Sequence, residues 1–138
     1  MLHMMGARRK VMKKEIIICF FVIILVMTLN TITESHTEVF VDKIEFDLQA
    51  LREDLISQKE DELMKKIDDV IQKWENEHEM LASYIEHNEL EKIEIYFWEV
   101  KSYLETKEYN MAVQGIDTSI FLMNHIKNRY KLSLRNIF

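Results

Sequence analysis

The residues of this chain whose types and spacing could do chemistry are its histidines and carboxylates. His87 is followed by Glu91 four residues later and by Glu94 seven residues later. Residues four apart share a helix face, and histidine with carboxylate is a ligand set that zinc accepts. We expect a turn between His87 and Glu91, however, and no second pair at helical spacing completes a shell. We therefore predict no metal site, and we place His78 and His125 near the core stripes of their helices.

Neighbouring carboxylates, such as Asp61-Glu62 and Asp68-Asp69, could support acid–base catalysis only in a desolvated cleft. Adjacent residues on a helix point roughly 100° apart and do not share a site. The chain has no GxSxG, no SxxK and no glycine-rich phosphate loop, and its single cysteine, Cys19, lies in an apolar run. The sequence therefore predicts no catalytic residues, no bound cofactor and no enzymatic activity.

An apolar run near the N-terminus reads IIICFFVIILVMTLNTI, from Ile16 to Ile32. At about 1.5 Å per residue it lies at the short end of what crosses a hydrocarbon core of roughly 30 Å. Five Lys or Arg residues precede the run, and none follows it before Lys43. The positive-inside rule therefore predicts a cytoplasmic N-terminus over residues 1–15, a transmembrane anchor over 16–33 and an extracytoplasmic domain over 34–138.

Two alternatives concern this anchor. A cleaved signal peptide has the same charge layout, but the stretch TLNTITES lacks the small-x-small pattern of a cleavage site, so we favour a retained anchor. Translation could also start at Met12 instead of Met1, which would leave two of the five basic charges in front of the apolar run.

The composition behind the anchor favours long helices and excludes nucleic acid as a partner. Residues 34–138 hold twenty-three acidic and thirteen basic residues, and such a domain repels phosphate backbones. The single cysteine excludes an intramolecular disulfide. Proline is absent and the only glycines are Gly6 and Gly115, which argues for helices joined by short polar turns. We expect Gly115 inside the last helix, at a close helix approach or a slight kink.

Apolar residues behind the anchor recur at spacings of three and four, which indicates amphipathic helices. We predict four of them, at about 38–57, 61–86, 89–106 and 109–128. Their stripes are Val41, Ile44, Leu48, Leu51 and Leu55; Leu63, Ile67, Val70, Trp74, Leu81 and Tyr84; Ile93, Phe97, Val100 and Leu104; and Ala112, Ile116, Ile120, Met123 and Ile126 or Tyr130.

The two halves of this domain are similar at a constant offset of 49 residues. The stretch DKIEFDLQALREDL from Asp42 lies over EKIEIYFWEVKSYL from Glu91, so that apolar positions coincide. This favours two related helical hairpins over a chance alignment of amphipathic helices. The predicted fold is all-α: an N-terminal transmembrane helix followed by an up-and-down four-helix bundle made of two similar hairpins.

Two surface features could bind partners. Ile95 and Trp98 fall opposite the core stripe of the third helix, a candidate interaction patch for a protein partner or a second copy, unless long side chains cover them. An even number of helices would bring the chain end back toward the membrane. The basic residues there could contact lipid headgroups, or could instead complement the negative end of the last helix. They are Lys127, Arg129, Lys131 and Arg135.

Several short segments together resemble a known family. They are HNELEKIE from His87, KSYLE from Lys101, FLMNHI from Phe121 and KLSLRNIF from Lys131, with Met12-Lys13-Lys14 before the apolar run and Trp74 in mid-chain. The chain resembles domain-of-unknown-function family 4363, small proteins of low-GC Gram-positive bacteria. The resemblance implies a single-pass tether and an outward helical domain, and it transfers no catalytic or binding residues.

The function predicted from the sequence is therefore non-catalytic. We expect a cell-membrane protein with a single N-in span, whose extracytoplasmic helical domain is a protein-interaction module. The alternative is a small-molecule-sensing bundle, because helical bundles can hold ligands between their helices.

Overall fold

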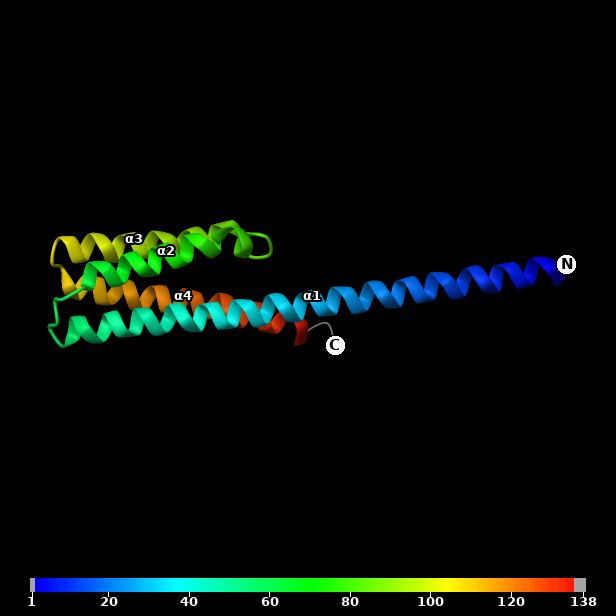
Figure 1. Ribbon diagram of the computed structural model, residues 1–138, viewed down its shortest axis with the longest axis horizontal. Coiled ribbons are helices and arrows are strands. Elements are labelled where there is room, and N and C mark those ends of the chain that lie inside the picture. Colours follow the sequence, from blue (N-terminus) through cyan, green and yellow to red (C-terminus); the bar gives the residue numbers. More distant parts are fainter. Residues whose placement is uncertain (1, 136–138) are drawn as a thin grey trace. The chain divides into compact units, whose positions relative to one another are not determined.

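The computed structural model describes the backbone of residues 2–135 and the side chains of residues 12–131. These residues form four helices and no strand: α1 (Leu2–Ile56), α2 (Leu63–Ala82), α3 (His87–Glu105) and α4 (Tyr109–Arg135) (Figure 1). The chain divides into two compact units, Met1–Ser35 and His36–Phe138, and α1 contributes residues to both. The all-α class is confirmed.

The first unit is an apolar length of α1. Its most apolar window of 18 residues has a mean hydropathy of 2.6, and none of that window is buried. The hydroxyls of Thr28, Thr31 and Thr33 each donate to the backbone carbonyl four residues earlier, at 2.8–3.1 Å. Because each hydroxyl is satisfied within the helix, these polar residues are compatible with an apolar surrounding. The composition fits a membrane span, and a signal sequence near the N-terminus would share it.

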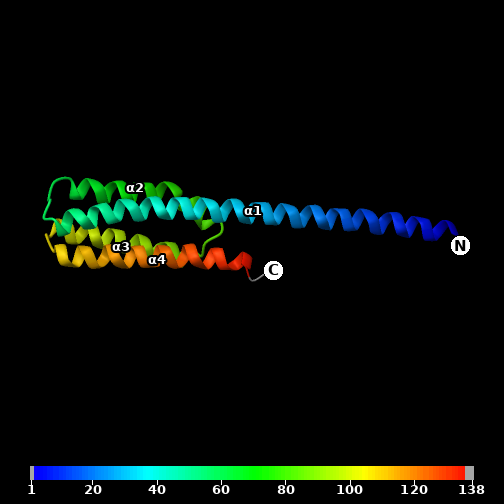
Figure 2. The ribbon, with the colours of Figure 1, turned by 90° about the horizontal axis from the view of Figure 1, so that it is seen from below.

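The second unit is a bundle of four helices packed side by side (Figures 1 and 2). The α1–α2 and α3–α4 turns lie at one end, called the two-turn end below, and the α2–α3 connection lies at the other. The predicted stripes fill the core, except that Tyr84, Ile120 and Tyr130 are only partly buried. The buried apolar side chains are Phe40, Val41, Ile44, Leu48, Leu51, Leu55, Leu63, Ile67, Val70, Ile71, Trp74, Leu81, Ile85, Leu90, Ile93, Phe97, Val100, Leu104, Ala112, Ile116, Met123 and Ile126.

Polar contacts along the α1–α4 seam keep one antiparallel register. From one contact to the next, the α1 residue moves back by seven, three and then four positions, and the α4 residue moves forward by the same numbers. Such matched spacing is expected where two helices pack with a heptad-like repeat. The contacts are Arg52–Asp117 at 2.7 Å, Glu45–Asn124 at 3.1 Å, Asp42–Lys127 at 2.6 Å and Glu38–Lys131 at 2.5 Å.

The first helix of each hairpin, α1 or α3, ends in the same kind of turn, and the two turns lie 49 residues apart in the sequence. Gln58 and Lys107 both adopt left-handed conformations, with φ of 56° and 58°. The amide of Lys59 donates to the Asp54 carbonyl at 2.9 Å, and the equivalent amide of Glu108 donates to Tyr103 at 2.8 Å. These are the bonds of a Schellman helix ending. The repeat seen in the sequence is therefore also a repeat of backbone geometry.

Ion pairs between the hairpins follow the same repeat with the partners exchanged. Arg52 of the first hairpin pairs with Asp117 of the second at 2.7 Å, and Lys101 of the second pairs with Asp68 of the first at 2.8 Å. Positions 52 and 101 are equivalent at the offset of 49, and so are 68 and 117. Reciprocal contacts of this kind are the mark of a two-fold relation, so the bundle has an approximate two-fold axis.

The helix limits differ from the prediction in several places. The predicted anchor and the predicted helix at 38–57 are parts of one helix, α1. Helix α2 ends at Ala82 and not near 86, because the Ser83 and Tyr84 amides donate to carbonyls only three residues earlier, each at 3.2 Å, and Glu86 is extended with ψ of 127°. Helix α3 consequently begins at His87, where we had expected a break. Helix α4 continues to Arg135 and not to about 128.

Gly115 marks a close approach of α4 to α3, one of the two expected roles. A Cβ at this position would lie 2.7 Å from Val100 Cγ2, and the β-branched valine has little rotamer freedom to move away. Gly115→Ala should gain roughly 1 kcal/mol of helix propensity but lose about 1–3 kcal/mol by overpacking.

We therefore expect Gly115→Ala to lower the melting temperature of the detergent-solubilised chain, measured by circular dichroism. The control is a double-mutant cycle with Val100→Ala, which should cost less in the Gly115→Ala background than in the wild type. Additive effects would show that contact with Val100 is not the reason for the glycine.

Candidate functional site

The candidate patch lies on the outer face of α3, with Ile95 55 % and Trp98 46 % exposed. Their neighbours Ile93 and Phe97 point into the core and are fully buried. Lys101 partly covers the patch, with its Nζ 5.2 Å from the Trp98 ring centroid. The Asp68 carboxylate of α2 holds that ammonium at 2.8 Å. A long side chain therefore covers part of the Trp98 ring, as the alternative interpretation expected. Close to half of Trp98 is still exposed to solvent.

Carboxylates outnumber cations around this patch. Glu91, Glu94, Glu99 and Glu105 lie on α3 with only Lys92 and Lys101 of opposite sign. The hydrogen bond to Asp68 raises the pKa of Lys101, so this cation is already engaged within the domain. The surface beside Ile95 and Trp98 is therefore apolar at its centre and net acidic at its rim.

Three of the four basic residues considered for lipid headgroups have carboxylate partners in the bundle. Lys127 pairs with Asp42 at 2.6 Å and Lys131 with Glu38 at 2.5 Å. Arg129 bonds Glu89 and also Glu86, and the charge of Glu89 raises its pKa. The side chain of Arg135 lies outside the described residues. These cations thus already hold α4 to α1 and α3, and headgroup contact stays a prediction.

The histidines fall in places that differ from the sequence interpretation. His87 and Glu91 share helix α3, with Nε2 3.0 Å from the carboxylate, and no turn separates them. His78 is half-buried, 3.6 Å from Glu94, and its ring meets that of His87 at 5.6 Å. His125 is exposed on α4, so its placement near the core was wrong. Among residues 12–131 no three His, Cys, Asp or Glu side chains are grouped to hold a metal ion.

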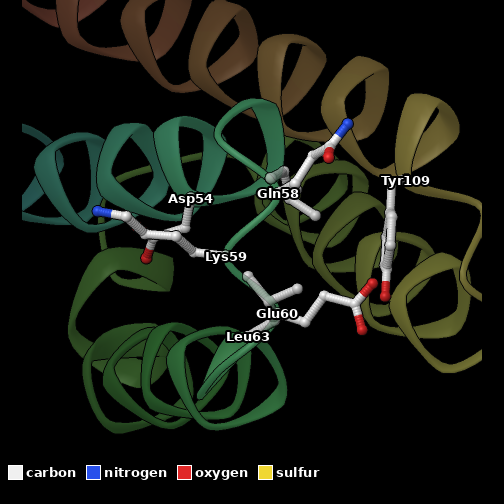
Figure 3. A pocket seen from close by; sticks show the side chains of 7 residues that line it. Asp54, Gln58, Lys59, Glu60, Leu63 and Tyr109 are labelled. Atoms are coloured by element: carbon white, nitrogen blue, oxygen red, sulfur yellow. The ribbon is translucent and has the colours of Figure 1, made fainter.

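A cavity at the two-turn end was missed by the sequence interpretation (Figure 3). Its volume is about 340 Å³, and residues from the α1–α2 turn and the start of α4 line it. The sequence repeat contains no signal of it, because the offset of 49 continues unchanged after the turn, from Ile67 on Ile116. The difference lies in the backbone. Helix α4 resumes at Tyr109, directly after its turn, whereas α2 resumes only at Leu63, three residues later than the repeat predicts. The lining residues are Asp54, Leu55, Gln58, Lys59, Glu60, Leu63 and Tyr109.

The family comparison matches residues 31–137 to the domain of unknown function (DUF4363). The chain belongs to the DUF4363 family. The match covers the whole of the helical bundle described above, and it confirms the resemblance read from the sequence segments. Comparisons of this DUF4363 chain with curated proteins and with solved structures give no match.

The end of the DUF4363 bundle opposite the two turns holds a buried polar contact. The Tyr84 hydroxyl lies 2.9 Å from the Thr37 hydroxyl, and Thr37 is almost completely buried. Burial raises the pKa of Tyr84, the Thr37 hydrogen bond lowers it, and the charge of Glu77 raises it, with a net rise. The folded state therefore favours the neutral phenol.

This rise predicts an alkaline loss of stability. Tyrosine in the unfolded chain ionises near pH 10, so the contribution of Tyr84 is complete below that value and is lost as pH rises toward the folded pKa. Chemical unfolding between pH 9 and 12 should show a smaller decline in free energy for Tyr84→Phe than for the wild type. Parallel pH profiles would mean that Tyr84 titrates alike in both states.

Proposed function

We propose that this chain is a membrane-anchored, non-catalytic interaction module, with its helical bundle on the extracytoplasmic side. The observation that carries the docking role is the exposed Ile95–Trp98 pair on α3. Trp is enriched among the residues that dominate protein interfaces, and its exposure at a rigid helix face costs little conformational entropy on binding.

The anchor is supported by the apolar length of α1 and by its flanking charges. The window with mean hydropathy of 2.6 lies wholly outside any core, and leaving such a surface in water is unfavourable by roughly 25 cal/mol per Å². Basic residues lie only on its N-terminal side as far as Lys43. This asymmetry favours a cytoplasmic N-terminus and an extracytoplasmic bundle.

The partner we propose is a helix of another protein that carries an apolar stripe flanked by Lys or Arg. Its apolar residues would cover Ile95 and Trp98, and its cations would meet the acidic rim formed by Glu91, Glu94 and Glu99. A second copy of the chain would bring the same excess of negative charge to the contact, so like charges disfavour it.

A photoreactive residue placed at Trp98 in native membranes tests the docking face. We expect an adduct that declines at high salt, because rim charges are screened, and that is lost when Ile95→Glu is added. Sequencing of the adduct should find Lys or Arg beside apolar residues in the captured segment.

The matched control is the same probe at Phe121, an aromatic on α4 that is 68 % exposed. It should give no such adduct. An adduct of two copies of this chain would replace the proposed partner by self-association, and equal capture at both positions would contradict a dedicated face.

Topology can be tested with the single cysteine replaced. In a Cys19→Ser background, Ser57→Cys should react with a membrane-impermeant maleimide in intact cells. Glu15→Cys, which follows both possible start residues, should react only after lysis, and both variants should remain on a chain of full size. Protection of Ser57→Cys would contradict the extracytoplasmic location, and loss of the segment that carries Glu15→Cys would indicate a cleaved signal.

A further inference from the structure

The cavity at the two-turn end lies where the backbone of the first hairpin differs from that of the second. The turns coincide through Gln58 and Lys107, and then Tyr109 starts α4 while residues 59–62 leave the helical path. Glu62 adopts φ of 66° and caps α2 without a side-chain hydrogen bond. A left-handed glutamate is unfavourable, and local strain of this kind persists only where surrounding structure imposes it.

Part of the cavity lining is apolar. Leu55 and Leu63 are buried beneath it, with 6 % and 5 % exposure, and the ring of Tyr109 from the other hairpin forms a side (Figure 3). A volume of about 340 Å³ lies at the small end of the range for ligand sites, roughly 300–1,000 Å³. The space suits a compact ligand body.

The charged groups of the cavity are divided between two sides. Asp54 is neutralised by Lys66 of α2, and Lys59 extends on the side of Asp54 (Figure 3). On the other side the Glu60 carboxylate points to the Tyr109 hydroxyl. Desolvation, followed by the charge of Glu60, raises the pKa of Tyr109, so the phenol stays neutral at physiological pH. Glu60 therefore supplies the negative charge on this side.

We propose that this cavity binds a small organic cation, an ammonium group on a compact apolar body. The ammonium would donate to the Glu60 carboxylate and lie against the Tyr109 ring, which attracts cations through its π face. The apolar body would cover Leu55 and Leu63. An anion is disfavoured on the Tyr109 side by the charge of Glu60. The sequence left ligand sensing as an alternative function, and this site gives it a location independent of the Ile95–Trp98 face.

The test is a nuclear magnetic resonance titration of the full chain in detergent with phenethylammonium, compared with its neutral counterpart 2-phenylethanol. We expect saturable shifts at residues 54–63 and 109 with the ammonium, and binding about tenfold weaker or more for the alcohol, since the charge-assisted hydrogen bond is absent. Equal binding of both compounds, or no saturable shift with either, would overturn the proposal.

Two variants test whether the Glu60 carboxylate is the group that binds the ammonium. Glu60→Gln should weaken phenethylammonium binding by about tenfold, as the alcohol does, while Glu62→Gln in the same turn should leave it unchanged. If Glu60→Gln does not fold, Tyr109→Leu tests the cation–π wall and should also weaken binding. If a folded Glu60→Gln or Tyr109→Leu variant bound phenethylammonium with unchanged affinity, the proposed site would be wrong.

Discussion

Burial of four apolar stripes against one another is the interaction on which the rest of residues 36–131 depends. Each buried Leu, Ile or Phe contributes roughly 1.5–3 kcal/mol, whereas an exposed ion pair contributes about 0–1 kcal/mol. The α1–α4 ion pairs therefore do not create the antiparallel alignment. Packing of residues such as Ile44 and Met123 sets it, and side chains at the flanks then meet at matched spacing. The polar seam adds to this register, because its charged pairs each join a carboxylate on one helix to a cation on the other.

Packing also explains which parts of the fold could be predicted from the sequence. Stripes of Leu, Ile and Val at spacings of three and four identify each helix because a helix repeats every 3.6 residues. The end of α2 could not be predicted in this way. Tyr84 and Ile85 continue the apolar pattern, but Ile85 is buried outside the helix and Tyr84 reaches Thr37 of α1. A contact 47 residues away along the chain overrides the local periodicity there.

The same limit applies to the candidate sites. The exposure of Ile95 and Trp98 followed from their angle on the helix, which is a local property. The position of Lys101 over the Trp98 ring did not follow, because Asp68 of a different helix holds it. The cavity at the two-turn end depends on a departure of three residues from an otherwise regular repeat. A comparison of the two sequence halves does not detect this departure, because the offset of 49 is the same on both sides of the turn. Only the folded chain shows where α2 begins and that Tyr109 lines the space beside it.

The reciprocal pairs Arg52–Asp117 and Lys101–Asp68 have a consequence for the history of the molecule. Each hairpin offers a cation near the end of its first helix and a carboxylate on its second, and each receives the complementary group from the other. A separate peptide with one such hairpin could pair both its cation and its carboxylate by dimerising with an identical peptide. Joining two copies in one chain would convert that symmetric dimer into a monomer. After such a fusion each half is free to diverge, so that one could keep a regular turn while the other opened a cavity.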